Sequence, residues 1–384
     1  MTLPASTISA HLASIRCVVI DMSILCNAEQ PLSLGPTVTR EGDFLYIPDE
    51  DAAEATNALS FKTYDGFAIR NLFQDVLHLP ICVITSDTRY ETIYRRRCAA
   101  MHVSEIFCGI SNKFTFLQNY SQKHGFALKN ILLFDRNLFL HSIQDRQLAA
   151  SVGLLVGADA FSTYESVPYV NIAPEPHGYV RGFSHRYLEP MTSIQAYHAQ
   201  TREEKAQPIP ELLSTESPMI RALVLDIDGT CTNACRIFSQ DGREWKRFCQ
   251  RDLRALRQWV DAGKILCFLT GDGSNNIVRW AETCGVDPSQ QLIRDAAHLK
   301  VQYLRQMATQ FHLQLREITY MGDDTNDLGV LEHIAEQGGF AACPQNAVPQ
   351  ILAIPGIHLM PSYGGNGACA DVIAALAGYL GKNK

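Results

Sequence analysis

The stretch LVLDIDGTCTN, residues 223–233, decides the fold of the C-terminal half of the chain. Three apolar residues open it, as in a buried strand, and Asp226 and Asp228 follow them directly. With one residue between the two acids, both carboxylates can face the crevice at the end of a sheet, and Gly229 permits a tight chain reversal there. The stretch therefore predicts a strand that delivers polar side chains to a site.

Further apolar runs of strand length lie at 265–269 and 318–321. Before the first of these runs, apolar residues recur at helical spacing from 253 to 260, and Gly263 suits the end of that helix. Strands that alternate with helices in this way predict an α/β fold, a doubly wound parallel sheet flanked by helices.

The bulk composition limits the organisation and the partners of the chain. A length of 384 residues exceeds what one hydrophobic core usually serves, so two domains are expected. The net charge of -7 and the pI of about 5.9 offer no broad basic surface for nucleic acid or an anionic membrane. The first residues lack a signal-peptide pattern, and no apolar run reaches the ~20 residues of a spanning helix. We therefore expect a cytoplasmic protein without a membrane partner.

Twelve cysteines are scattered singly and include no CxxC pair. We expect them to be reduced thiols in the core. Cys231 and Cys235, which lie closest together, admit a metal or redox role as well as ordinary packing.

The two halves of the chain share an ordered set of motifs. The C-terminal half contains LVLDIDGTCTN, WKRFCQRD, CFLTGDGS, AAHLK and ITYMGDDTND, and the N-terminal half answers with VVIDMSILCN, SFKTYDGFAIR, CVITSDTRY, ISNK and ILLFDRNLF. Their spacing agrees as well, because Thr85 and Lys113 are 28 positions apart and Thr270 and Lys300 are 30 apart. The sequence therefore predicts a tandem repeat.

The repeat sets the predicted domain boundaries. We predict tandem Rossmann-like domains at 1–190 and 219–384, joined by a linker at 191–218 that is polar and contains three prolines. The N-terminal copy has about eighteen additional residues, which we expect to form a longer surface loop within 27–60.

Each polar residue of the C-terminal set has an ordinary explanation when it is taken alone. Carboxylates after strands are often helix caps, a single lysine is usually solvated, and acids beside glycine often make turns. The ordered set is far more specific. DIDGT, a strand that ends in Thr270, the isolated Lys300 and GDDTND resemble the four signatures of haloacid dehalogenase (HAD) superfamily phosphatases. This resemblance implies an HAD fold and a phosphoric monoester hydrolase.

The resemblance also implies roles for individual acids. Asp226 would attack phosphorus to form an aspartyl phosphate, while Asp228 would protonate the leaving alkoxide and then activate the hydrolytic water. A phosphate ester repels an anionic nucleophile, so the site needs a cation, and hard oxygen ligands suit Mg²⁺. The implied ligands are Asp226, the backbone carbonyl of Asp228, Asp323, Asp324 and Asp327.

Three further residues would bind the phosphoryl group of a small phosphorylated substrate. Lys300 supplies a positive charge, and Thr270 with the amide of Gly271 supplies hydrogen bonds beside a helix that begins near Ser274. Together these groups would neutralise and orient the phosphate.

The N-terminal copy lacks several of these groups. Asp21 matches the nucleophile, but Ser23 replaces the acid–base residue, and a serine hydroxyl cannot give and reclaim a proton as a carboxyl group does. Arg136 and Phe139 replace two acids of the metal motif, while Asp135 survives. We therefore expect a degenerate, inactive domain in which the Arg136 guanidinium pairs with Asp21 or Asp135 in place of magnesium.

Within the superfamily, the chain resembles 3-deoxy-D-manno-octulosonate 8-phosphate phosphatases. The motifs of the C-terminal half lie too close together for a large cap domain, and WKRFCQRD and YGGNGACADVIAALAG resemble segments of this subgroup. The resemblance implies a sugar-acid phosphate as substrate. Arg247 and Arg251 are candidates to hold its acidic group, although ordinary solvated arginines fit the pattern equally well.

Two departures from the subgroup leave other functions open. Asn366 and Asp272 stand where the subgroup often has arginine, so cations that would hold a sugar carboxylate are missing. The alternatives are a phosphatase for another sugar phosphate of the nonulosonate 9-phosphate type, a phosphatase for a small phosphometabolite, and a non-catalytic HAD-like assembly protein.

The resemblance bears on assembly as well. Members of the subgroup without a cap form tetramers in which a neighbouring subunit closes the substrate pocket. We hypothesise that the N-terminal domain acts as a covalently attached neighbour, which makes the chain an intramolecular pseudo-dimer. A homodimer of tandem chains is the other expected assembly.

Overall fold

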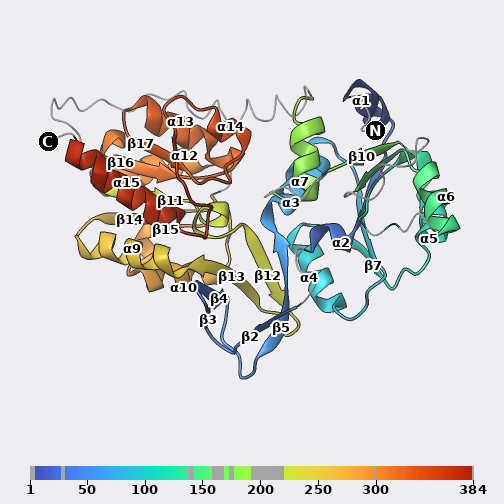
Figure 1. Cartoon of the computed structure of the whole chain (residues 1–384), viewed down its shortest axis with the longest axis horizontal. Coiled ribbons are helices and arrows are strands. Elements are labelled where there is room, and N and C mark those ends of the chain that lie inside the picture. The colour runs from blue at the N-terminus through green and yellow to red at the C-terminus, as the bar shows by residue number, and fades with distance from the viewer. Residues whose placement is uncertain are drawn as a thin grey trace. The chain divides into compact units, whose positions relative to one another are not determined.

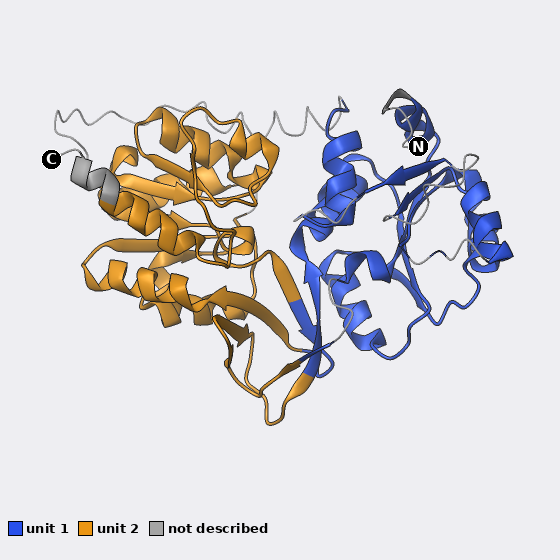
Figure 2. Ribbon diagram, in the orientation of Figure 1, with its two compact units in different colours: residues 1–32, 57–197, 237–242 blue, residues 33–56, 198–236, 243–384 orange. Residues whose placement is uncertain are grey.

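The computed structural model describes residues 5–26, 31–136, 138, 142–157, 168–172, 177–191, 220–296 and 299–382. The chain divides into two compact units, coloured separately in Figure 2. Unit 1 contains Met1–Leu32, Asn57–Tyr197 and Ile237–Gly242; unit 2 contains Ser33–Thr56, His198–Arg236 and Arg243–Lys384. Most of the predicted linker, from 192 to 218, lies outside the described residues.

Unit 1 contains a six-stranded parallel sheet with the strand order β10-β9-β8-β1-β6-β7 (Figure 1). Its strands are β1 (Cys17–Asp21), β6 (Ile81–Thr85), β7 (Glu105–Cys108), β8 (Ile131–Phe134), β9 (Leu154–Gly157) and β10 (Tyr169–Asn171). Its helical segments are α1 (Ala5–Ala13), α2 (Met22–Leu25), α3 (Thr63–Phe67), η1 (Ala68–Val76), α4 (Glu91–Ala100), α5 (Lys113–Lys123), η2 (Leu128–Asn130), α6 (Ile143–Ser151), α7 (Tyr179–Phe183) and η3 (Ser184–Leu188).

Unit 2 contains a second parallel sheet, with the order β15-β14-β11-β16-β17-β18. Its strands are β11 (Ala222–Leu225), β14 (Ile265–Leu269), β15 (Leu292–Ile293), β16 (Ile318–Met321), β17 (Phe340–Cys343) and β18 (His358–Leu359). Its helical segments are η4 (Ile227–Cys231), α9 (Gln250–Asp261), α10 (Asn275–Cys284), α11 (Pro288–Gln291), α12 (Lys300–Gln310), η5 (Leu315–Glu317), η6 (Thr325–Asp327), α13 (Leu328–Glu336), α14 (Pro349–Leu352) and α15 (Ala368–Lys382).

Both faces of the unit 2 sheet are buried. Leu223 and Leu225 of β11 pack in one hydrophobic core with α9, α10 and α15, while Ala222 and Val224 pack in another with α12, α13 and α14 (Figure 1). A strand that is covered on both sides reads as a continuous apolar run, which is why residues 222–225 show no alternation. The predicted parallel α/β fold is confirmed, and so are the three strands predicted from 223, 265 and 318.

The two sheets have the same connectivity. When the strands of each sheet are counted along the chain, both sheets have the order 3-2-1-4-5-6. In each sheet the first strand is central. The second and third strands are added on one side of it, and the fourth to sixth strands on the other. Ligands bind at this switch point in open α/β sheets, so the carboxyl ends of β1 and β11 are the places to look for a site.

The prediction of a surface loop within 27–60 is wrong, because most of the described residues in this range form strands. They are β2 (Leu32–Leu34), β3 (Thr39–Glu41), β4 (Phe44–Pro48) and β5 (Thr56–Lys62). In unit 2, β4 pairs antiparallel with β3 and with β13 (Glu244–Cys249), and Ile47 lies opposite Lys246. Leu45 and Ile47 are almost fully buried and join the core of unit 2. The strand that pairs with β4 thus lies about 200 residues further along the chain. The remaining strand, β12 (Cys235–Ser239), precedes β13 in the sequence.

No helix among the described residues is long and apolar enough to cross a membrane.

Asp252 connects α9 to the start of α15. Its carboxylate accepts hydrogen bonds from the N–H groups of Gly367 at 3.1 Å and Ala370 at 2.8 Å. Asp65 in unit 1 has the same role, because its carboxylate accepts from the N–H groups of Val180 and Arg181 at the start of α7. Each acid provides the oxygen acceptors that the first turn of a helix lacks.

Asp252 gives the stability of the chain a defined pH dependence. Burial raises the pKa of Asp252 to about 6 from 3.8, against the opposing effect of its two backbone hydrogen bonds. Between pH ~4 and ~6 the folded chain keeps a proton that the unfolded chain has released, so this contribution to the free energy of unfolding falls as the pH rises, by about 3 kcal/mol in total. In Asp252→Asn this decline is absent. Urea unfolding of both proteins at pH 4.5, 5.5 and 7 measures the difference, and parallel pH profiles would contradict the assignment.

Candidate active site

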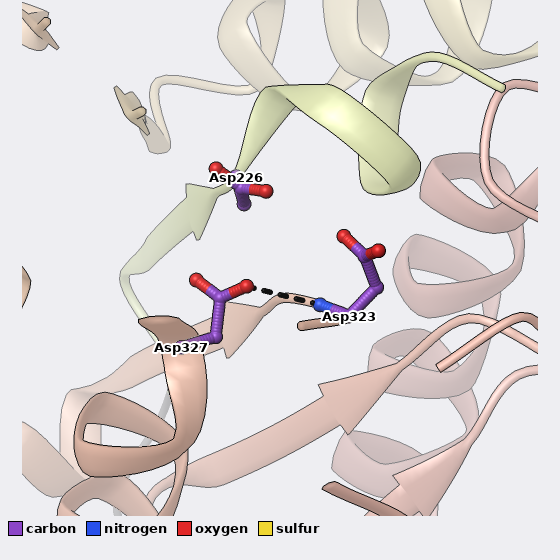
Figure 3. A group of neighbouring side chains, drawn as sticks. All are labelled: Asp226, Asp323 and Asp327. Carbon is purple, nitrogen blue, oxygen red and sulfur yellow. Dashed lines mark hydrogen bonds between the residues drawn. The ribbon is translucent and has the colours of Figure 1, made fainter. Parts of the chain in front are cut away.

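Three buried carboxylates gather at the switch point of the unit 2 sheet. Asp226 follows β11, Asp323 lies two residues after β16, and Asp327 ends η6 (Figure 3). One carboxylate oxygen from each lies within 4.8 Å of the others. Because β11 and β16 are adjacent parallel strands, the loops that follow them meet at one edge of the sheet. Three anionic oxygens at this spacing are a ligand set that fits Mg²⁺.

A buried lysine bridges two of these acids. The Nζ atom of Lys300, the first residue of α12, lies 2.7 Å from Oδ1 of Asp226 and 2.7 Å from Oδ1 of Asp327. Burial opposes its charge, but the two carboxylates raise the pKa of Lys300, so the side chain stays protonated. Burial also raises the pKa of Asp226 to about 7, although Lys300 lowers it. When all four groups are ionised, three carboxylates and one ammonium leave the cluster negative, which favours a further cation.

Asp327 has further partners that fix its position. Its carboxylate accepts hydrogen bonds from the Tyr320 hydroxyl at 2.5 Å and from the N–H groups of Asp323 and Asp324 at 3.1 and 3.3 Å. On the other side of the cluster, the Thr230 hydroxyl donates to Oδ1 of Asp323 at 2.9 Å. These bonds hold the carboxylates in place in a buried site where an unpaired acid is costly.

Asp228 faces a second lysine. Gly229 has a φ of +92°, and this reversal, predicted from the sequence, turns the chain after Asp228. The Asp228 side chain accepts hydrogen bonds at Oδ1 from Lys246 Nζ at 2.5 Å and from the Thr232 hydroxyl at 3.3 Å. Burial raises the pKa of Asp228 while Lys246 lowers it. The net rise favours the protonated form that a general acid needs.

The structure brings together three of the five predicted metal-site residues. The side chain of Asp228 points to Lys246, whereas the prediction involves its backbone carbonyl. Asp324 accepts the N–H of Thr325 at 2.7 Å and caps η6, which is the ordinary role for an acid in such a turn. Roles for both residues at a metal ion stay predictions.

Of the predicted phosphate-binding residues, Lys300 contacts the acidic cluster, and Thr270 follows β14, the strand that pairs with β11. Thr270 is buried, and its hydroxyl oxygen accepts the N–H of Asp272 at 3.1 Å. Helix α10 begins at Asn275 with Ser274 as its N-cap, as predicted. Gly271 is the residue between Thr270 and Asp272, and its amide role stays a prediction.

The two candidate substrate arginines contact protein groups. Arg247 donates from Nη2 to Oδ1 of Asn366 at 3.0 Å, and its guanidinium lies 4.0 Å from the centroid of the Phe44 ring. Arg251 forms an ion pair with Asp371. Binding of a substrate by either arginine stays a prediction.

Sequence reasoning missed Lys246, Tyr320 and Thr230. It read WKRFCQRD for its arginines, yet strand alternation places Lys246 and Phe248 on one face of β13, and the Phe248 ring stacks on Trp280 in the core. A lysine on the same face of a strand as a core phenylalanine indicates a buried cation that is paired with an acid. Thr230 lies within DIDGT and Tyr320 within ITYMGDDTND, and neither carries a comparable signal.

The corresponding residues of unit 1 form a smaller charged cluster. Lys113 Nζ lies 2.8 Å from Oδ2 of Asp21 and 2.5 Å from Oδ2 of Asp135. The sequence analysis expects Arg136 in this role, and the structure supplies Lys113 instead. Phe139 lies outside the described residues.

All twelve cysteines are free, and ten are buried. The expectation of reduced core thiols is confirmed. Cys231 contacts Cys369, with 3.7 Å between the two sulfur atoms, and burial raises the pKa of Cys231.

The parallel α/β unit with its acidic switch-point site has named relatives, although no protein-family model matches the chain. Over 166 residues, 43% of this chain and 83% of the relative, the sequence is 25% identical to the 3-deoxy-D-manno-octulosonate 8-phosphate phosphatase of Yersinia pestis. This relative is a phosphoric monoester hydrolase by name, in agreement with the enzyme class predicted from the sequence.

Two solved structures are similar to the chain as well. The first is a phosphatase of the same name from Moraxella catarrhalis in complex with magnesium ion, phosphate ion and KDO, at 24% identity over 43% of this chain and 94% of that chain, with a TM-score of 0.38. The second is the cobalt-bound deoxy-D-mannose-octulosonate 8-phosphate phosphatase from Haemophilus influenzae, at 22% identity over 43% of this chain and 88% of that chain, with a TM-score of 0.36.

Replacement of Lys300 by methionine tests the bridge between the carboxylates. Lys300→Met leaves Asp226 and Asp327 buried without their cation, and the loss of one partner of a buried ion pair costs about 3–5 kcal/mol. We expect this loss in the free energy of unfolding, measured by urea denaturation in metal-free buffer. Lys264→Met is the matched control, because Lys264 donates to the backbone carbonyl of Ile220, and its loss is expected to be about 1 kcal/mol. Equal losses in the two variants would contradict the bridging role.

Proposed function

We propose that this chain is a magnesium-dependent phosphomonoesterase that acts on a sugar-acid phosphate of the 3-deoxy-D-manno-octulosonate 8-phosphate type. The observation that carries the proposal is the buried cluster of Asp226, Asp323 and Asp327, joined by the Lys300 ammonium. The Yersinia pestis relative, which is named for that substrate, supports the substrate class.

In the first step, a carboxylate oxygen of Asp226 forms a bond to phosphorus while the bond from phosphorus to the sugar oxygen breaks. The leaving oxygen takes a proton from Asp228, so the sugar departs as an alcohol. Lys300 lies against the nucleophile and provides positive charge next to the phosphoryl group. The products of the step are an aspartyl phosphate at 226 and an ionised Asp228.

In the second step, a water oxygen attacks phosphorus and gives a proton to Asp228. The bond between phosphorus and Asp226 breaks, and inorganic phosphate leaves. Both carboxyl groups then have their starting protonation states. Magnesium held by Asp226, Asp323 and Asp327 would supply the positive charge that offsets repulsion between the carboxylate and the phosphoryl oxygens.

Removal of the nucleophile tests the proposal directly. The purified chain with magnesium is expected to hydrolyse 4-nitrophenyl phosphate, and Asp226→Asn is expected to lower kcat by more than about 1000-fold, because an amide oxygen is too weak a nucleophile to form the phospho-enzyme. Release of 4-nitrophenolate is followed by absorbance. Asp21→Asn is the matched control, with the same change in unit 1, and keeps wild-type turnover. Absence of turnover by the wild-type chain would favour the alternative of a non-catalytic assembly protein.

We also propose that the N-terminal half is a degenerate copy of the catalytic domain. The shared strand order 3-2-1-4-5-6 supports a duplication, as does the helix-capping role common to Asp65 and Asp252. Ser23 in the acid–base position and Lys113 between the two surviving acids support the loss of activity.

The role of the N-terminal domain as a covalently attached neighbour stays a hypothesis. A chain truncated near Pro218 does not test it cleanly, because that truncation also removes β4. Leu45 and Ile47 of β4 belong to the core of unit 2, so the shortened chain would lose packing within the catalytic unit itself.

Metal stoichiometry tests the proposed difference between the two copies. Full-length, metal-free chain is expected to bind one Mg²⁺, because unit 1 keeps only two acids, Asp21 and Asp135, with Lys113 against both, and has Phe139 where unit 2 has its third acid. Isothermal titration calorimetry measures the number of ions bound. Asp323→Asn is expected to abolish binding, and the matched change Asp135→Asn is expected to preserve it. Two ions per chain would contradict the proposal.

A further inference from the structure

A buried ammonium stands between the acid–base residue and a second carboxylate. The Nζ atom of Lys246 lies 2.5 Å from Oδ1 of Asp228 and 2.9 Å from Oδ2 of Asp272, and its side chain is 0% exposed. A lysine in such a place cannot move freely to solvent, and it supplies positive charge to both acids, to which Arg236 contributes as well.

Strand pairing and aromatic packing hold the part of β13 that carries Lys246. Ile47 of β4 lies opposite Lys246 in the antiparallel ladder. Phe248, on the same face, stacks on Trp280 of α10 with 4.1 Å between ring centroids. The backbone at residue 246 is therefore held in place, and the Lys246 side chain reaches Asp228 from a fixed position.

Asp272 anchors the ammonium from the other side. Its Oδ1 atom accepts the N–H of Ser274 at 2.8 Å at the start of α10, and its Oδ2 atom faces Lys246. The carboxylate is thus fixed by a helix terminus, and it fixes Lys246 in turn. This contact gives Asp272 a local role at a position where the sequence analysis notes only a missing arginine.

The donors around Asp228 distinguish its two oxygens. Both Lys246 and the Thr232 hydroxyl donate to Oδ1. The Thr232 oxygen itself accepts the N–H groups of Gly229 and Ala234 at 3.4 and 3.3 Å, which leaves its proton for Asp228. Within the described part of the chain, the side-chain contacts of Asp228 fall on Oδ1. Both side-chain donors therefore engage Oδ1, and Oδ2 is the oxygen that they leave for a substrate group.

We infer that Lys246, held by Asp272, is a positioning residue that orients Asp228 so that Oδ2 delivers the proton to the leaving oxygen. The inference rests on the proposed function. As Asp226 bonds to phosphorus and the bond to the leaving oxygen breaks, that oxygen takes the proton from Oδ2. Asp228 becomes a carboxylate, and the Lys246 ammonium already lies against it. Lys246 itself touches neither substrate nor phosphorus.

The test uses aryl phosphates that differ in the acidity of the phenol they release. An acidic phenol such as 4-nitrophenol leaves without a proton, while phenol itself needs one, so only the second reports on delivery by Asp228. The quantity measured is kcat/KM, which stops at phospho-enzyme formation and excludes the later water step. In Lys246→Met, kcat/KM for phenyl phosphate is expected to fall about 100-fold or more, and that for 4-nitrophenyl phosphate less than about 10-fold.

A second variant and a control complete the experiment. Asp272→Asn keeps an oxygen for the Ser274 N–H but weakens the anchor of Lys246, and it is expected to increase the same selectivity by a smaller factor. It decides the question if Lys246→Met does not fold, since unchanged selectivity in Asp272→Asn would overturn the inference. Lys264→Met, remote from Asp228, is expected to show wild-type selectivity.

The outcomes separate this inference from the proposed function. Equal loss for both phosphates in Lys246→Met, with turnover by the wild-type chain, overturns the positioning role alone. Absence of turnover of either phosphate by the wild-type chain overturns the proposed function and the positioning role with it.

Discussion

The site depends on one buried positive charge shared by two negative ones. Lys300 is 1% exposed and lies 2.7 Å from each of two carboxylates, and without it the fold would bury Asp226 and Asp327 as uncompensated neighbours. Ion pairs of this kind add little net stability, but removal of one partner is costly. The lysine therefore allows the fold to bury an acidic cluster. One ammonium does not balance three carboxylates, and a divalent ion would supply the remaining positive charge.

Asp226 and Asp228 are only two residues apart, but each contacts a different lysine. Asp226 points to Lys300 from α12, and Asp228 points to Lys246 from β13. The positive φ of Gly229 turns the chain directly after them. In the proposed mechanism Asp226 attacks phosphorus while Asp228 carries a proton, so the two carboxyl groups need different surroundings. Two lysines from different elements provide them around one short loop.

The elements that sequence analysis predicted are those whose signal is local. Strand β11 reads as an apolar run because both of its faces are covered, α10 begins directly after Ser274, and Gly263 has the positive φ that follows the end of α9. The pairing of β4 with β13 was missed because it joins segments about 200 residues apart. The apolar residues of β4, such as Leu45 and Ile47, do not by themselves specify which strand they pair with. Lys246 was missed for the same reason, since its partners come from two other loops.

Unit 1 has a lysine and two acids at the positions that correspond to Lys300, Asp226 and Asp323 of unit 2. The sequence has Phe139 where the metal motif has its last acid, and Lys113 contacts Asp135 in addition to Asp21. In the degenerate copy proposed above, Asp21 and Asp135 are buried and still need a neighbouring positive charge. The contacts of Lys113 therefore have a structural explanation that requires neither a phosphate ligand nor a metal ion. The lysine at this position thus compensates buried acids in both units, and in the proposed mechanism Lys300 has a catalytic role in addition.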